Sequence, residues 1–349
     1  MVVLSGFPCS VSIIPGFGRT KLMARILSRV DLQRCLTMPA AIAAMRVAFR
    51  ALAAQQVQMP PRLAVPLPEQ GVTLLMPSLL QTSTEDALSL KIITVAPRNP
   101  FRGLPLSYAS VLLLDPFSGR TLAIMEGGWL TAMRTGAVAG LATDLFARRD
   151  ADVLALFGAG AQAVTQVLAI HTVRPLREVR VVNRNEEHYH HLVAQLRALL
   201  GPSCPAIRRA ASAHDALDGA LLIDCATTAT MPLFSYQDVM PGTHINAIGA
   251  FTPEMCEVGT DTLTHARIIV DQRAAALSEA GDLLQAMAAG VTTPEDWQEL
   301  GHVLDADVQR QPEEITVFKS VGVAVQDAAV ATVVYQEACE LDVGIEIDV

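Results

Sequence analysis

The sequence is poor in charged and aromatic residues, which make up 17% and 5% of its 349 residues, whereas 51% are hydrophobic. No uninterrupted apolar run approaches the length that spans a bilayer, so we expect no membrane-spanning segment. The formal net charge is −9, with no basic run and no aromatic–basic alternation, which makes nucleic acid a poor candidate partner. A buried parallel sheet together with an obligate subunit interface explains the apolar content better, and we therefore expect a homo-oligomer.

Paired cysteines, a secretion signal and the motifs of covalent hydrolases are also absent. The N-terminus has no basic region ahead of a hydrophobic segment, and no G-x-S-x-G motif or plausible Cys–His pair occurs. His188 and His191 share a helical face without a Cys or carboxylate partner, which indicates a solvated helix end and no metal site. The six cysteines form no C-x-x-C pair and are typical of a reducing, cytoplasmic compartment: Cys9, Cys35, Cys204, Cys225, Cys256 and Cys339.

A chain of this length exceeds one ordinary core, so two domains are expected. Residues 1–22 carry Gly, Pro and Ser without periodicity and are predicted to be a disordered extension. Residues 23–136 and 316–349 are predicted to form one discontinuous α+β domain, because an apolar helix over Thr316–Leu341 would dock back on the first half. Its other predicted elements are a helix over Ala40–Leu52 capped by Thr37, a helix over Trp129–Phe146, and strands at Leu63–Leu67, Val72–Met76, Leu88–Val95, Tyr108–Asp115 and Leu122–Met125.

Residues 137–315 carry the pattern of a nucleotide-binding domain. The apolar strand Val153–Phe157 leads into Gly158-Ala-Gly160-Ala-Gln162-Ala163 and then a helical run, which is the Gly-x-Gly-x-x-Ala dinucleotide fingerprint. The alternative is a tight strand-to-helix turn without a ligand. Strand–helix alternation predicts an α/β, Rossmann-type doubly wound parallel sheet. Further strands are expected at Glu178–Val182, Ala206–Ala210, Leu221–Cys225, His244–Ile248 and Arg267–Val270, and helices at Glu187–Leu200, Leu277–Ala289 and Pro294–Leu300.

The tip of the second Rossmann strand indicates which nicotinamide is used. That strand normally ends in a carboxylate that binds the ribose 2′-hydroxyl of NAD. Here it runs into Asn183-Arg184-Asn185, and an Arg pairs with a 2′-phosphate that a carboxylate would repel. We therefore expect NADP(H) to be preferred, with NAD(H) possible, unless Arg184 is merely a solvated surface residue.

Several motifs, taken in order, resemble the ornithine cyclodeaminase/mu-crystallin family from about Ile26 to the end of the last helix. What the resemblance implies is a homodimer whose first domain builds the subunit interface and binds an amino- or imino-acid carboxylate beside the nicotinamide. The motifs are Met59-Pro-Pro-Arg62, Leu90-Lys91, Arg134-Thr135-Gly136-Ala137, Gly158-Ala-Gly-Ala-Gln162, Ile245-Asn246-Ala247-Ile248-Gly249 and Phe318-Lys319-Ser320-Val321-Gly322.

The resemblance also assigns roles to individual residues. Arg62, Lys91 and Arg134 match the family's substrate-carboxylate cluster, and such a cluster of cations is tolerable only if an anion normally fills it. Glu279 is within reach of the same site, with a helix-start charge as the alternative. Lys91 is the predicted catalytic residue. The predicted cofactor residues are Thr135, Gly158, Ala159, Gly160, Ala161, Gln162, Asn183, Arg184, Asn185, Thr227, Thr228, Ile248 and Lys319, and His244 is either near the cofactor or an ordinary strand-edge residue.

One departure from the family pattern selects among its activities. The cyclodeaminases carry an acidic residue where this chain has Phe251, and a phenyl ring accepts no proton. The segment Gly249-Ala-Phe-Thr-Pro253 resembles the corresponding segment of the ketimine reductases. These enzymes use NADPH to reduce Δ1-pyrroline-2-carboxylate or Δ1-piperideine-2-carboxylate to L-proline or L-pipecolate. The alternatives are an ornithine cyclodeaminase, an alanine-type amino-acid dehydrogenase, and a non-enzymatic NADPH-dependent binding protein like mu-crystallin.

Overall fold

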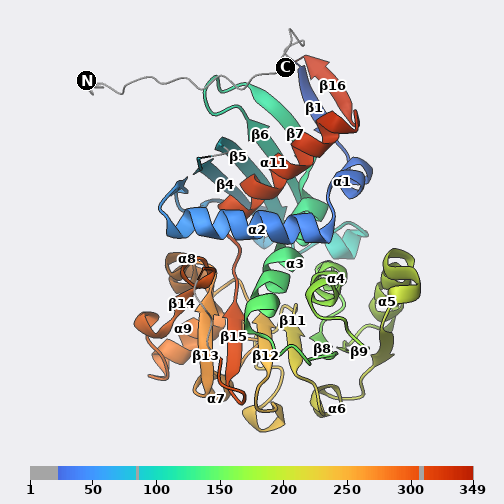
Figure 1. Cartoon of the computed structure of the whole chain (residues 1–349), viewed down its shortest axis with the longest axis vertical. Coiled ribbons are helices and arrows are strands. Elements are labelled where there is room, and N and C mark those ends of the chain that lie inside the picture. The colour runs from blue at the N-terminus through green and yellow to red at the C-terminus, as the bar shows by residue number, and fades with distance from the viewer. Residues whose placement is uncertain (1–22, 84–85, 306–309, 349) are drawn as a thin grey trace.

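The structure, a computed structural model, describes residues 23–83, 86–305 and 310–348, so the predicted disordered extension lies outside the described residues. They form two sheets, one above the other in Figure 1, joined by the helix α3 (Gly127–Phe146). A described helix long and apolar enough to cross a membrane is not found; only the pair α1 and α2 meets that test together, and it is bent by 83°.

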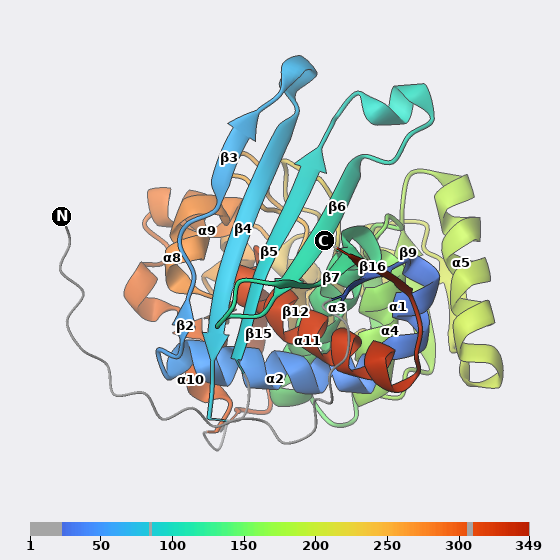
Figure 2. The ribbon, with the colours of Figure 1, turned by 90° about the horizontal axis from the view of Figure 1, so that it is seen from above.

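The first sheet is an antiparallel meander from β4 to β7, to which β1 adds in parallel beside β7, and helices lie against one side (Figure 2). Thr37 caps α2 by accepting a hydrogen bond from the Ala40 amide, and α2 and α11 pack against each other, with α11 also lying on β4, β5 and β6. The strands are β1 (Met23–Leu27), β2 (Val57–Gln58), β3 (Leu63–Pro66), β4 (Val72–Gln81), β5 (Asp86–Val95), β6 (Ser107–Leu114), β7 (Thr121–Glu126) and β16 (Ile345–Asp348), and the helices are α1 (Arg29–Cys35), α2 (Met38–Ala53) and α11 (Ala324–Glu340).

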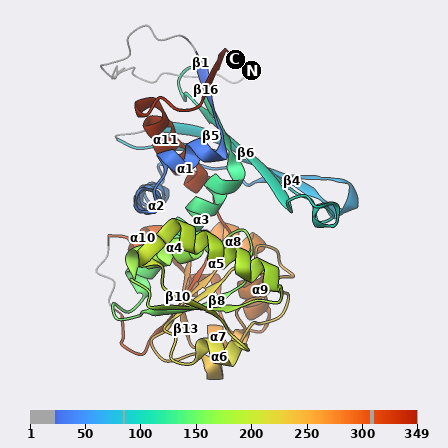
Figure 3. The ribbon, with the colours of Figure 1, turned by 90° about the vertical axis from the view of Figure 1, so that its right-hand side faces the viewer.

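All strands of the second sheet run parallel, in the order β10-β9-β8-β11-β12-β15-β13-β14. One core cluster joins the sheet to α4 and α5, and another joins the sheet to α6, α7 and α9; Figure 3 shows α4 and α5 on one side of the sheet and α6 and α7 on the other, so the predicted doubly wound α/β fold is confirmed. The strands are β8 (Val153–Phe157), β9 (Glu178–Val182), β10 (Ala206–Arg209), β11 (Leu222–Cys225), β12 (His244–Ala247), β13 (Ala266–Val270), β14 (Gln298–Glu299) and β15 (Ile315–Lys319). The helices are α4 (Ala163–Val173), α5 (Glu186–Leu200), α6 (Ala213–Leu217), α7 (Thr260–Leu263), α8 (Arg273–Glu279), α9 (Gly281–Ala288) and α10 (Leu300–Val303).

Small residues let α3 approach α4 closely where the two halves of the molecule meet. A Cβ added at Gly136 would lie 2.4 Å from the Thr165 carbonyl oxygen, and one at Gly140 would lie 3.0 Å from the Ala169 Cβ. Because α3 also contacts α2, α11 and β12, it belongs to the packing of both sheets. The predicted boundary between residues 136 and 137 therefore falls inside one continuous helix.

The predicted helix over Thr316–Leu341 is wrong at its start. Ile315–Lys319 is β15, a fully buried strand between β12 and β13, and the helix α11 begins only at Ala324. A strand buried on both faces is as apolar as a buried helix, so composition did not separate them. Gly322, with φ +79°, breaks the two elements apart. The second sheet thus continues through Lys319, and the return to the first half comes after it.

Two other predicted helices are also corrected. Leu277–Ala289 is split between α8 and α9 at Ala280, whose ψ of 85° lies outside the helical range. Pro294–Leu300 is a single 3₁₀ turn, Pro294–Asp296, followed by β14 and the start of α10. Trp297 follows this turn with an extended backbone, and its buried ring fills the core.

Candidate active site

The glycine turn after β8 has the shape of a phosphate-binding loop. Gly158 has φ +102°, and a Cβ there would lie 2.6 Å from the Ala226 carbonyl oxygen, so both backbone and space require glycine. A Cβ at Gly160 would meet nothing within 4 Å, and no side chain caps the first turn of α4. Open space therefore lies over amide groups at a helix N-terminus, which fits a dinucleotide's phosphates.

Two loops lie beside this turn at the carboxyl ends of β11 and β12. A Cβ at Gly249 would lie 2.1 Å from the Thr227 carbonyl oxygen, so the two loops touch. Ile248 is buried and Thr228 is exposed beside them. Among the described atoms, the Gln162 Oε1 in the neighbouring turn is buried with no hydrogen-bond partner. This edge is where doubly wound sheets bind their ligands, and its orphaned polar atom fits a bound cofactor.

The tip of β9 is held in place by backbone and side-chain hydrogen bonds. The Arg209 Nη2 donates to the Asn183 carbonyl oxygen at 3.1 Å, and the Asn185 Oδ1 accepts from the His188 amide at 3.0 Å as the cap of α5. Arg184, between them, is exposed. Asn185 thus has a structural task in addition to its predicted cofactor contact.

The three predicted cations come together with a carboxylate that the sequence analysis missed. The Lys91 Nζ on β5 lies 2.7 Å from the Asp327 Oδ2 on α11, and the Arg134 Nε on α3 lies 3.2 Å from the Asp327 Oδ1. The Arg134 Nη1 also donates to the Gln326 Oε1 at 2.8 Å. Lys91 and Asp327 are fully buried. An acid inside an otherwise apolar helix was the signal that could have revealed Asp327.

Arg62 and Glu279 complete the cluster from the other side. The Arg62 Nε lies 2.9 Å from the Glu279 Oε1, and the Arg62 Nη2 donates to the Gly322 carbonyl oxygen at 2.7 Å. A Cβ at Gly322 would lie 2.5 Å from the Arg134 Nη1, so this glycine touches both arginines. The Asp271 Oδ2 accepts from the Gly322 amide at 2.8 Å and fixes that contact.

These carboxylates correct the argument that only an outside anion could balance the cations. Asp327 and Glu279 offset two of the three positive charges of Arg62, Lys91 and Arg134, which leaves one net positive charge. A single substrate carboxylate would neutralise that remainder. The cluster therefore suits a small monoanionic head group rather than a phosphate or a dicarboxylate.

Two groups of the cluster have pKa values moved toward neutrality. Burial, together with the neighbouring Arg134, lowers the pKa of Lys91 to about 8, although Asp327 opposes the change. Burial raises the pKa of Glu279 to about 7 against the opposing effect of Arg62. Among the described atoms, the Glu279 Oε2 is buried without a hydrogen-bond partner. Both side chains can therefore exchange a proton near neutral pH.

Three other residues that the sequence connects with the cofactor are Lys319, Thr135 and His244. Lys319 is fully buried, with its Nζ 2.6 Å from the Asp282 Oδ2, and Thr135 is buried beside Arg134 on α3. His244 lies at the amino end of β12, opposite the glycine turn, where it pairs with Thr316 and stacks on Phe146. Burial lowers the pKa of His244 to about 3, so it is a neutral core residue and does not lie near the cofactor edge.

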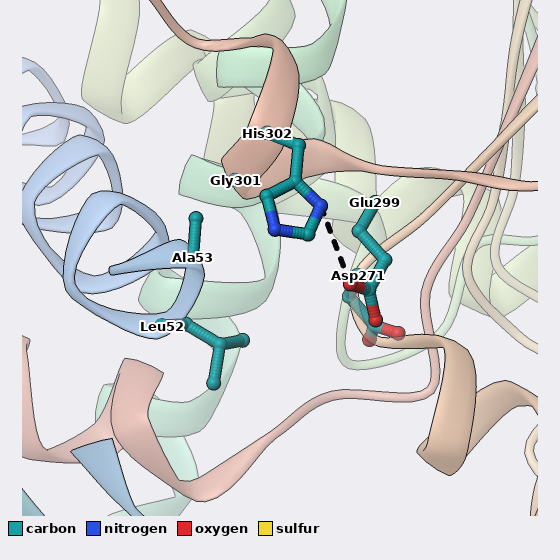
Figure 4. A pocket seen from close by; sticks show the side chains of 6 residues that line it. All are labelled: Leu52, Ala53, Asp271, Glu299, Gly301 and His302. Atoms are coloured by element: carbon teal, nitrogen blue, oxygen red, sulfur yellow. Dashed lines mark ion pairs between the residues drawn. The ribbon is translucent and has the colours of Figure 1, made fainter. Parts of the chain in front are cut away.

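A small cavity behind the Asp271 loop does not add a second site. It is lined by residues of α2, α10 and the end of β14, and the His302 Nδ1 lies 3.5 Å from the Glu299 Oε2 beside it (Figure 4). The Asp271 carboxylate already accepts hydrogen bonds from Ser320, Val321 and Gly322. The cavity thus lies against a loop that the cation cluster uses.

The fold and site define a protein with a dinucleotide-binding sheet and an adjoining cationic site for a small acid. The family model of the ornithine cyclodeaminase/mu-crystallin family matches residues 23–341. The chain is 34% identical over 328 residues to a Delta(1)-pyrroline-2-carboxylate reductase of Bacillus cereus, covering 93% of this chain and 99% of that protein. It is 36% identical over 280 residues to the ketimine reductase mu-crystallin of Mus musculus, covering 80% and 85%.

A solved structure agrees with these relatives. The Thermococcus litoralis Delta(1)-pyrroline-2-carboxylate reductase, in complex with NADH and L-proline, superposes with a TM-score of 0.87 at 34% identity, covering 93% of this chain and 100% of that one. The chain belongs to the ornithine cyclodeaminase/mu-crystallin family. The predicted family, fold class and enzyme class, a nicotinamide-dependent oxidoreductase, are confirmed.

Proposed function

We propose that the protein uses NADPH to reduce a cyclic ketimine acid, Δ1-pyrroline-2-carboxylate or Δ1-piperideine-2-carboxylate, to L-proline or L-pipecolate. The observation that carries the proposal is the cation cluster, with one net positive charge and two groups that exchange protons near neutral pH. The B. cereus and T. litoralis relatives bear the same activity in their names.

The substrate carboxylate is expected to bind Arg62 and Arg134, whose guanidinium groups already meet at Gly322. In the described structure Arg62 also pairs with Glu279 and Arg134 with Asp327, so the substrate carboxylate would add to these pairs and neutralise the one net positive charge that remains. Lys91, held by Asp327, would pair with the carboxylate and relay a proton to the ring nitrogen through water.

The cofactor is expected to lie along the carboxyl edge of the second sheet, with Gly158 to Gln162 around its phosphates and Thr135, Thr227, Thr228, Ile248 and Lys319 toward its nicotinamide end. When bound, the reduced nicotinamide supplies a hydride to the electrophilic C2 of the iminium. The protein's own contribution is to hold the substrate at attack distance, which is worth several kcal/mol of the barrier.

Preference for NADPH is supported by charge at the tip of β9. Three other arginines in or next to β9 and β10 all pair with carboxylates, namely Arg177, Arg180 and Arg208. No ion pair of Arg184 or Arg209 occurs within the part of the chain that the structure describes, and Arg209 contacts the loop that carries Arg184. Two guanidinium groups without a carboxylate partner would suit a 2′-phosphate. The T. litoralis relative was solved with NADH, so the preference for NADPH over NADH is best tested by substitution at this tip.

A homodimer is part of the proposal. The strands and loops from β3 to β6 expose large apolar side chains, among them Leu63, Phe101 and Tyr108, the second with 85% of its surface exposed. Side chains of this kind, gathered along one extended part of a sheet, suit burial against a second copy. A cytoplasmic location completes the proposal and rests on the cysteine pattern of the sequence.

The alternatives within the family differ in a measurable product. Phe251 is partly exposed on the loop after β12 and supplies no acid, which disfavours ornithine cyclodeamination. The decisive experiment follows oxidation of NADPH and of NADH with the two cyclic imines and with pyruvate plus ammonia, and it follows ammonia release from ornithine with a catalytic amount of NAD⁺. NADPH oxidation with a cyclic imine supports the proposal. Ammonia release from ornithine, turnover of pyruvate alone, or bound NADPH without turnover would each replace it by the corresponding alternative.

A matched pair of variants ties this activity to the site. Arg62→Ala removes a proposed carboxylate contact, whereas Arg50→Ala removes an exposed arginine paired with Asp305. We expect the first to raise the KM for the imine by at least about tenfold, the usual effect of losing one charged hydrogen bond. The second should leave all constants unchanged.

A further inference from the structure

A buried carboxylate outside the predicted site fastens the two loops at the cofactor edge. The Glu257 Oε1 accepts from the Thr227 amide at 2.6 Å and from the Thr227 Oγ1 at 2.8 Å. Its Oε2 accepts from the Gly249 amide at 2.6 Å and the Ala250 amide at 3.1 Å. One side chain thus joins the loop after β11 to the loop after β12.

The hydrogen bonds also decide the charge state of this side chain. Burial raises the pKa of Glu257, while Lys319 and the Thr227 donors oppose that change. Three of the four contacts come from backbone amides, which can only donate, and the Thr227 Oγ1, which accepts from the Ala229 amide at 3.2 Å, has its own proton free to donate to Glu257. The arrangement therefore binds the ionised form.

A second layer holds Glu257 from behind. The Asp282 Oδ1 accepts from the Glu257 amide at 2.5 Å and the Val258 amide at 2.9 Å, and its Oδ2 lies 2.6 Å from the Lys319 Nζ. All three side chains are buried. Lys319 offsets only one of the two carboxylates, so the network carries one net negative charge beneath the loops. The nearby Asp224 is also buried, and burial together with Glu257 raises its pKa well above the usual value.

We propose that Glu257 is a positioning residue that fixes both loops under the nicotinamide and favours its cationic, oxidised form through its own negative charge. The inference rests on the proposed function only in placing the nicotinamide over these loops. Loss of a hydride makes the ring positive, so a fixed negative charge beneath it stabilises what the reaction produces. Lys319 acts indirectly: it pairs with Asp282, and Asp282 holds the backbone amide of Glu257.

The test uses binding alone, so that it does not depend on which imine is reduced. The dissociation constants of NADPH and NADP⁺ are measured by fluorescence for the wild type and for Glu257→Gln and Glu257→Asp. In Glu257→Gln we expect the dissociation constant of NADP⁺ to rise about tenfold more than that of NADPH, as loss of one nearby charge predicts. In Glu257→Asp, which keeps the charge but shortens its reach, both forms should weaken equally.

A matched control separates positioning from general loss of stability. Thr316→Val removes a buried hydroxyl that pairs with His244 at the opposite edge of the sheet, and it should lower the melting temperature without changing either constant. If Glu257→Gln behaves like Thr316→Val, with an unchanged ratio of the two constants, the proposal is overturned. A wild type that binds nicotinamide yet reduces no cyclic imine would instead overturn the proposed function alone.

A second variant covers the case in which Glu257→Gln does not fold. Thr227→Val removes the hydroxyl that donates to the Glu257 Oε1 and accepts from the Ala229 amide, and it leaves the carboxylate charge in place. We expect it to raise the dissociation constants of both NADPH and NADP⁺ at least threefold, with little change in melting temperature. Unchanged binding of both forms would contradict the positioning role.

Discussion

Replacing Asp327 with Asn tests the electrostatics of the cation cluster directly. The substitution keeps the shape of the side chain but leaves Lys91 and Arg134, 2.7 and 3.2 Å from its oxygens, without their shared carboxylate. Because Lys91 and Asp327 are fully buried, we expect a loss of about 3–5 kcal/mol in the free energy of unfolding, typical of breaking a buried pair. That is a large share of the roughly 5–15 kcal/mol that holds a domain together.

The same change should move the chemistry of Lys91. Asp327 is the group that holds the pKa of Lys91 up against burial and Arg134, so without it the pKa falls further below about 8. Less of the ammonium form then remains at neutral pH, and the basic limb of the activity profile moves to lower pH. Asp305→Asn, which breaks an exposed pair with Arg50, should cost at most about 1 kcal/mol and leave the profile unchanged.

Urea unfolding and the pH dependence of kcat measure both effects. The predicted electrostatic role is refuted if Asp327→Asn unfolds at the same urea concentration as Asp305→Asn, or if the two pH profiles coincide. A stability loss with an unchanged profile would show that Asp327 holds the fold but does not govern Lys91.

Three further predictions concern the loops and the titrating lysine. Arg184→Asp should reverse the preference for NADPH over NADH, measured as the ratio of kcat/KM, and leave the melting temperature unchanged. Gly158→Ala should destabilise the protein through its φ of +102° and the contact with Ala226, whereas Gly160→Ala should fold normally and weaken cofactor binding, as circular dichroism and fluorescence titration will report. The pKa of Lys91 is about 8 in the folded protein and 10.5 in the unfolded chain, so the unfolded chain binds more protons between these pH values. The free energy of unfolding therefore rises with pH over this range. Lys91→Met should flatten that rise, as urea unfolding at several pH values will report.

Short apolar strands between turn residues were the most predictable part of the fold. Val153–Phe157 and Glu178–Val182 were predicted with the bounds that the structure has, because glycine, proline or a polar loop ends each one. Ile315–Lys319 was misassigned because burial on both faces removes the alternation that marks a strand. The terminal strands β1 and β16 were missed, since each is stabilised by pairing with the other across the whole chain.

The cations of the site were easier to find than the carboxylates. Lys91 and Lys319 are the chain's only lysines beyond residue 21, and each lies in an apolar strand where an idle charge would be costly. Asp327 and Glu257 were overlooked because their partners are distant in sequence or are backbone amides of another loop. Sequence spacing carries no record of such contacts, which depend on how α11 packs on β5 and how the loops after β11 and β12 meet.

The proposed reaction delivers a hydride to C2 of a cyclic imino acid held by the cation cluster. The most direct measurement incubates the protein with Δ1-pyrroline-2-carboxylate and NADPH deuterated at the transferable C4 position, and locates the deuterium in the product by mass spectrometry and NMR. We expect L-proline with one deuterium at its α-carbon. NADPH that remains unoxidised with both ring sizes, or product without deuterium at that carbon, would contradict the proposed reaction.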